Sequence, residues 1–113
     1  MDVSLRDEVV EVVQSAVDAM TIRVNDSPHA ALEAAVLTGA GKARRRITQR
    51  HRAGMLGRDE FLEGIRLVGA GVIPSRELVR QLRPPRDLRF EGGTIEEILF
   101  DHPGCAFSTS ASA

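Results

Sequence analysis

Apolar residues recur at helical spacing in several stretches of this chain, and a capping residue precedes most of these stretches. The first stretch covers residues 4–20, with Ser4 as its cap and apolar side chains three or four residues apart. Ser27-Pro28 begins a second helical stretch, because proline is favoured at the first position of a helix. Gly39 and Gly41 predict that this second helix ends there, since glycine commonly follows the last helical turn.

The second half of the chain carries similar helix starts and stops. We expect a basic helix over residues 42–53 and another helix over residues 58–68. Ser75 caps a short helix that Pro84-Pro85 terminates, because proline lacks the backbone N–H that a continuing helix needs. The pattern therefore predicts five or six short helices.

These elements predict an all-α fold: a small bundle of about five short helices with an extended C-terminal arm. Residues 20–25 alternate between apolar and polar, which fits either one short strand or the frayed end of the first helix. We place a helical domain at residues 1–83 and the C-terminal arm at residues 84–113. The arm carries one short helix at about residues 94–101, started by a capping-box pattern at Thr94, and ends in a disordered tail.

The composition limits the size and the kind of core of this protein but does not indicate its function. A chain of 113 residues is one domain by size, and its core must be aliphatic because it has four Phe and no Trp or Tyr. The net charge of −1 says nothing about partners. Fourteen Arg against one Lys is a bacterial-like composition, typical of a GC-rich coding sequence.

The distribution of charge is more informative than its sum. Residues 42–58 contain no acid, whereas residues 1–33 are predominantly acidic. A basic block of this kind indicates a surface for an acidic partner or a polyanion. The candidate binding residues are its seven cations: Lys42, Arg44, Arg45, Arg46, Arg50, Arg52 and Arg58.

We interpret the chain as a non-enzymatic, regulatory interaction module that self-associates and docks a protein partner. The Ala-rich second helix and the separate acidic and basic segments favour a homo-oligomer. Two alternatives stay open for the basic block. It can bind DNA or RNA, with arginines on the phosphates. It can also pair with the acidic N-terminal helix, in the same chain or in a neighbour.

The short helix of the C-terminal arm has a small apolar face. It docks either on its own domain or into a groove of a partner, as segments that fold on binding do. The candidate partner-binding residues of the arm are Ile95, Ile98, Leu99 and Phe100.

We find no catalytic, metal or cofactor signature and expect no enzymatic activity. His102 and Cys105 lie close in sequence, but two ligands do not make a metal site, and nothing beside them orients a nucleophile. A single cysteine fits a reducing compartment, and we see no signal peptide and no membrane span. The expected location is therefore the cytoplasm.

Thr21 to Asn25, followed by Ser27-Pro28 and a helix, resembles the strand and first helix of ribbon-helix-helix repressors. The resemblance implies a dimer whose paired strands enter the major groove, with Thr21, Arg23 and Asn25 contacting bases. The chain departs from that family in two ways. A long helix precedes the strand, and the loop that would lead to the second helix of the ribbon-helix-helix is Gly-rich and basic.

Two other segments invite comparison with known motifs. Residues 49–65 resemble the helix hairpin of short C-terminal oligomerisation domains, which implies two helices joined by a tight turn. The positions that match are Gly54, Met55, Leu56, Asp59, Glu60 and Phe61. Residues 61–83 offer two helices of a helix-turn-helix, but the linker between them is longer than that motif allows.

Overall fold

The structure is a computed structural model that describes residues 4–22, 27–69, 73–85 and 94–101. Within these residues the chain forms helices and no strand, which confirms the all-α prediction. The helices are α1 (Leu5–Asp18), α2 (Pro28–Arg52), α3 (Arg58–Val68), α4 (Arg76–Val79) and the π-helical turn η1 (Glu97–Asp101). The alternative of a strand near residues 20–25 is wrong for residues 20–22, which have no regular structure, and residues 23–25 lie outside the described part.

Short polar side chains start the helices where the sequence places them. The hydroxyl of Ser4 accepts a hydrogen bond from the Asp7 N–H at 3.1 Å. Ser27 and Ser75 cap α2 and α4 in the same way. Thr94 accepts from the Glu97 N–H at 3.1 Å and begins the arm helix, as predicted. Each cap satisfies an N–H that has no partner inside its own helix.

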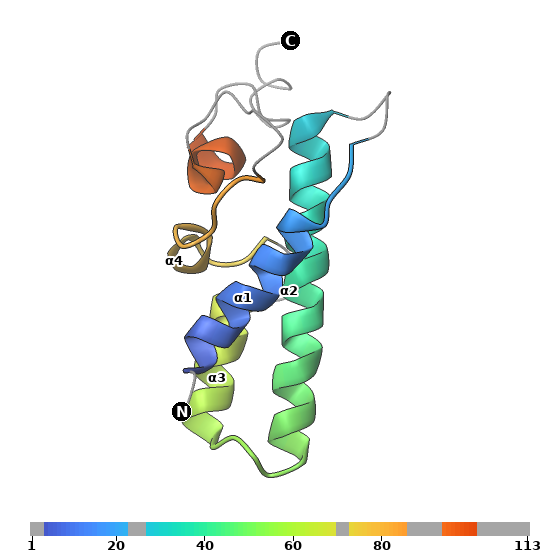
Figure 1. Cartoon of the computed structure of the whole chain (residues 1–113). Helices are drawn as coiled ribbons and strands as arrows, with labels where there is room; N and C mark the ends of the chain where they lie inside the picture. Colours follow the sequence, from blue (N-terminus) through green and yellow to red (C-terminus); the bar gives the residue numbers. More distant parts are fainter. Residues whose placement is uncertain (1–3, 23–26, 70–72, 86–93, 102–113) are drawn as a thin grey trace.

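Helix α2 corrects the prediction of two helices interrupted at Gly39 and Gly41. It is one helix of 25 residues, about 37 Å long, and it runs through both glycines into the basic block (Figure 1). A single buried apolar stripe explains this continuity, because its members recur every three or four residues on both sides of the glycines. The stripe consists of Leu32, Val36, Ala40, Ala43 and Ile47.

Helices α1 and α2 are antiparallel (Figure 1), and their backbones come close together at Gly39. A Cβ atom at Gly39 would lie 2.8 Å from Val13 Cα and 3.1 Å from Ala16 Cβ. The glycine is therefore the point where the two backbones approach, and it does not end the helix.

Two other glycines do end helices. Gly54 follows α2 with φ +75°, and the Met55 N–H donates to the Arg50 carbonyl at 2.8 Å, which is the bond pattern of a Schellman turn. Gly69 follows α3 with φ +73°. The helix hairpin implied by the resemblance of residues 49–65 is thus present as α2, a short turn and α3, with contacts between the two helices.

The arm helix packs on the domain that precedes it. Ile95, Ile98 and Leu99 are buried at 0%, 2% and 5% exposure and belong to the same apolar cluster as the residues of α1 and α2. His29 in the first turn of α2 lies 3.1 Å from the Ile98 carbonyl oxygen, measured from its Nε2. The described part of the arm therefore completes the core.

Candidate interaction surface

The basic block lies on the C-terminal half of α2 and the start of α3. The structure divides its seven cations into two groups according to whether they contact the rest of the chain. Arg44, Arg46 and Arg50 have partners on α1 or at the end of α3. Lys42, Arg45, Arg52 and Arg58 are exposed.

Arg44 holds the end of α3. Its Nε and Nη2 donate to the Gly69 carbonyl oxygen at 3.2 and 2.8 Å. This carbonyl lies at the C-terminus of α3, where the helix dipole favours a cation and where backbone acceptors lack helical partners. Arg44 is therefore a structural residue, and its guanidinium is already engaged.

Arg46 and Arg50 face Glu8 of α1. The Arg46 Nη1 lies 3.9 Å from one Glu8 oxygen, and Arg50 donates a close, short hydrogen bond to the other. Glu8 is only 20% exposed, so this contact is partly shielded from solvent. The alternative that the basic block pairs with the acidic N-terminal helix holds for these two arginines within the same chain.

The exposed cations on α2 lie on one face. Lys42, Arg45 and Arg52 are three and seven residues apart, which brings them to the same side of the helix. Within the described residues none of the three has an ion pair, and neither has Arg58, which follows the hairpin turn. We call Lys42, Arg45 and Arg52 the cation row.

A groove of about 1180 Å³ runs between α1 and α2 beside the cation row. Helix α1 contributes Glu8, Glu11, Val12, Ser15, Ala16 and Ala19, together with Ser4 and Leu5 at its start. Helix α2 contributes Lys42, Arg46 and Arg50, and Met55 and Glu60 lie at the hairpin end. The groove thus has an acidic wall on α1 and a basic wall on α2, and its apolar side chains come from α1 and from the hairpin turn.

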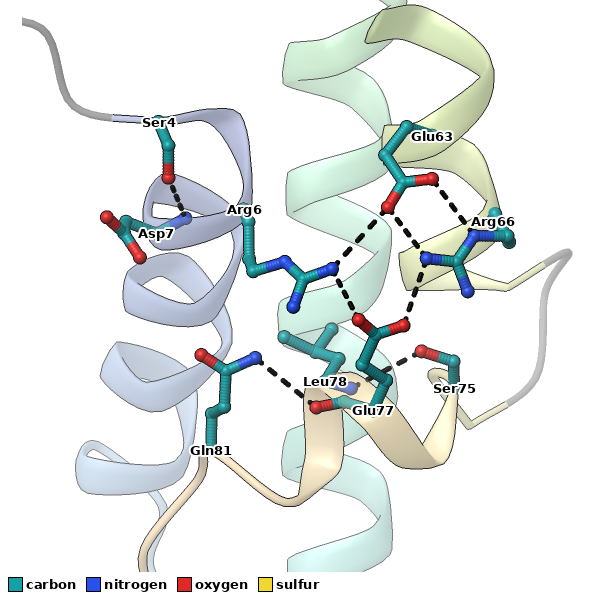
Figure 2. A network of polar contacts seen from close by, with 9 residues as sticks. All are labelled: Ser4, Arg6, Asp7, Glu63, Arg66, Ser75, Glu77, Leu78 and Gln81. Carbon is teal, nitrogen blue, oxygen red and sulfur yellow. Dashed lines mark hydrogen bonds and ion pairs between the residues drawn. The ribbon is translucent and has the colours of Figure 1, made fainter.

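On another side of the molecule, a network of four charges joins three helices (Figure 2). Arg6 of α1 contacts Glu63 of α3 at 3.6 Å and Glu77 of α4 at close range. Arg66 donates to Glu63 at 2.7 Å and to Glu77 at 3.0 Å. These hydrogen bonds from Arg66, reinforced by Arg6, lower the pKa of Glu63 and the pKa of Glu77, and they raise the pKa of Arg66.

Gln14 makes a tertiary contact that neither the charge pattern nor the motifs predict. Its side-chain oxygen accepts from the Arg83 N–H at 2.8 Å, and its Nε2 donates to the Arg83 carbonyl at 2.9 Å. The residue is 7% exposed. Gln14 lies four residues after Val10 and three before Val17, so the sequence puts a polar side chain on the apolar face of the helix. A buried polar side chain needs a hydrogen-bond partner, and this is the signal that could have identified Gln14.

The arm residues proposed for partner binding are engaged in the core. Ile95, Ile98 and Leu99 are buried, and Phe100 is half-buried with the Arg76 guanidinium 4.7 Å from its ring centre. Their apolar face therefore docks on its own domain, which is one of the two alternatives drawn from the sequence.

Among the residues that the structure describes, no group of three or more His, Cys, Asp or Glu side chains is placed to hold a metal ion. His51 stacks on Phe61 at 4.1 Å between ring centres, and its buried Nδ1 has no hydrogen-bond partner in the described part. His102 and Cys105 lie outside the described residues, as do Arg23 and Asn25 from the ribbon-helix-helix resemblance.

The comparisons with known proteins return nothing: no family model, no curated protein and no solved structure matches this chain. Among the described helices, none combines the length and the apolar character needed to cross a membrane.

Proposed function

We propose that this chain is a non-enzymatic helical interaction module that self-associates and docks an acidic protein surface on the cation row. One observation carries the docking surface. Of the seven cations in the basic block, those of the row and Arg58 are exposed and, in the described residues, have no carboxylate partner. Helix α2 supplies no counter-charge nearby, since Glu33 is its only acid.

The surroundings of the cation row favour a protein over a nucleic acid. Exposed Gln49 lies between Arg45 and Arg52 on the same helix and can hydrogen-bond to a partner backbone. Guanidinium groups bind carboxylates through paired hydrogen bonds, so aspartate and glutamate side chains are suitable ligands. The His51 ring stacks on one face of Phe61, and Phe61 is partly buried against the apolar cluster, so little of this ring is left for stacking a base.

A binding experiment with poly-L-glutamate as the acidic probe tests this proposal. The double variant R45A/R52A keeps good helix formers in α2 and removes two charges from the row. We expect affinity to fall by roughly tenfold or more, with a weaker dependence on salt. The control A30E/A34E changes the net charge by the same amount at two exposed positions in the N-terminal half of α2. Equal losses in both variants would show that only total charge matters and would refute the row as a docking site.

The second candidate is a regulator that binds nucleic acid through the same cations. The observation in its favour is that Lys42, Arg45, Arg52 and Arg58 are exposed and have no ion pair in the described residues, so up to four cations can reach phosphates. Binding to a mixed-sequence duplex would then fall with salt at a logarithmic slope of about −3.6. Arg44 and Arg50 contribute less to this slope because both already have partners in the chain. A steep slope with duplex and no binding to poly-L-glutamate would favour this candidate.

A further inference from the structure

We infer that a second copy of this chain covers the groove between α1 and α2, by two-fold association. The inference rests on the self-association in the proposed function and names the surface that performs it. Helix α3 packs against α1 and α2 on another side of the helix pair, whereas the groove side is open and about 1180 Å³ in volume. Met55 at its hairpin end is 71% exposed, the most exposed of the large apolar side chains in the described part.

The two walls of the groove carry opposite charges that this chain does not fully balance. Glu8 on the α1 wall is matched by Arg46 and Arg50. Glu11 on the α1 wall and Lys42 on the α2 wall are both exposed, and neither has an ion pair in the described residues. Each wall therefore presents one charge that a neighbouring molecule can neutralise.

Glu11 and Lys42 lie at nearly the same level along the groove. The helices cross where Val13 meets Gly39, and they are antiparallel. Glu11 precedes Val13 by two residues, about 3 Å along α1, and Lys42 follows Gly39 by three, about 4.5 Å along α2. Because the helices run in opposite directions, both displacements point the same way, toward the hairpin end.

This register selects one kind of two-fold axis. An axis parallel to the groove places the α1 wall of one copy over the α2 wall of the other, so that Glu11 meets the partner's Lys42 twice. An axis perpendicular to the groove, running from one wall to the other at the level of Glu11 and Lys42, places like walls together and sets equal charges against each other. An isologous pair repeats each contact, so the first arrangement gains two ion pairs and the second gains two repulsions.

The dimer leaves the rest of the cation row available. Arg45 and Arg52 do not line the groove, so each copy keeps both arginines for an acidic partner. A dimer carries two such rows and should bind a partner with two acidic segments more tightly than a single row would. The reason is that the first contact raises the effective concentration for the second.

Sedimentation of the full chain with a charge swap tests the inference. We expect E11K and K42E each to weaken dimerisation by roughly tenfold or more, because each creates two like-charge contacts. The double variant E11K/K42E should dimerise within about threefold of the original chain, since it restores the pairs in reverse. The matched controls E33K and R52E change charge equally outside the groove lining and should leave the dimer unchanged. Far-UV circular dichroism checks that all variants are folded.

The other outcomes separate this inference from the proposed function. A monomer at every concentration overturns the groove interface and the self-association together. A dimer that neither E11K nor K42E weakens leaves self-association standing and overturns the groove. Loss of the dimer in the double variant as well as the single ones overturns the reciprocal pairing of Glu11 and Lys42. Binding to poly-L-glutamate, measured on the original chain, E11K and E33K, reports on the cation row separately, because these three keep Lys42, Arg45 and Arg52.

Discussion

At the scale of the residue, two glycines within one turn of α2 have different environments. Gly39 faces α1, where an added Cβ would come within 2.8 Å of backbone. Gly41 faces open space, and the nearest atom to an added Cβ is the Arg45 Nη1 at 4.0 Å. The first glycine permits the close approach of two helices, whereas the second only lowers the intrinsic stability of α2.

Substituting each glycine by alanine should therefore change stability in opposite directions. We expect Gly39→Ala to destabilise the fold by about 1–3 kcal/mol, because the new methyl group must push α1 away. Gly41→Ala should stabilise it by about 0.5–1 kcal/mol through helix propensity. Urea unfolding followed by far-UV circular dichroism measures both. Equal effects of the two substitutions would contradict the crossing point at Gly39.

The sequence predicts the role of a residue when that role depends on residues nearby in the chain. The caps at Ser4, Ser27 and Ser75 are predictable, because each hydroxyl bonds to an N–H three residues later. The role of Gly39 is not, because a glycine that ends a helix and one that admits a neighbouring helix look alike until the neighbour is placed. The contact of Gln14 with Arg83 joins positions 69 residues apart, so its partner is not visible from local sequence.

At the scale of the element, charged side chains link α1, α3 and α4 on the surface (Figure 2). Glu63 and Glu77 share Arg66 and Arg6, and Arg66 lowers the pKa of both carboxyl groups from the ordinary value of 4.5. A folded state that lowers these pKa values binds fewer protons in acid than the unfolded chain. Its extra stability is present above about pH 4.5 and is lost as the pH falls through the lowered values.

The pH dependence of unfolding should depend on this network. We expect the free energy of unfolding to decrease below pH 4.5, and the decrease to be smaller in the variant E63Q/E77Q, which has no carboxylates to protonate there. Glu33→Gln is the control, because Glu33 has no ion pair in the described residues. Urea titrations at several pH values measure the slope. An unchanged acid slope in E63Q/E77Q would contradict the role of the network.

The packing of the arm helix on the core predicts how much Ile98 contributes to stability. If η1 and the turn before it complete the core, Ile98→Ala should destabilise the whole domain by about 2–5 kcal/mol, as for other buried isoleucines. Leu62→Ala is the matched control, because Leu62 is 51% exposed on α3 and its loss should cost far less. Thermal unfolding of both variants distinguishes them. A neutral Ile98→Ala would instead indicate an arm that is held by a partner.

At the scale of the whole molecule, the fold engages some of its cations and leaves others on the surface. The sequence locates the basic block correctly, because charge clustering is a local property. It cannot separate Arg44, which holds the Gly69 carbonyl, from the exposed Arg45, since the side chains of adjacent helical residues differ only in direction. The groove wall at Glu11 was missed for the same reason: it becomes a feature only when α1 lies beside Lys42.

We propose a chain that self-associates and presents its cation row to an acidic protein. Size-exclusion chromatography with light scattering tests this proposal most directly, in low and high salt, with absorbance of peptide bonds and of nucleobases followed together. We expect one peak at twice the chain mass of 12.3 kDa, without nucleobase absorbance. A monomer, or a peak that carries nucleic acid in low salt and releases it in high salt, would contradict it.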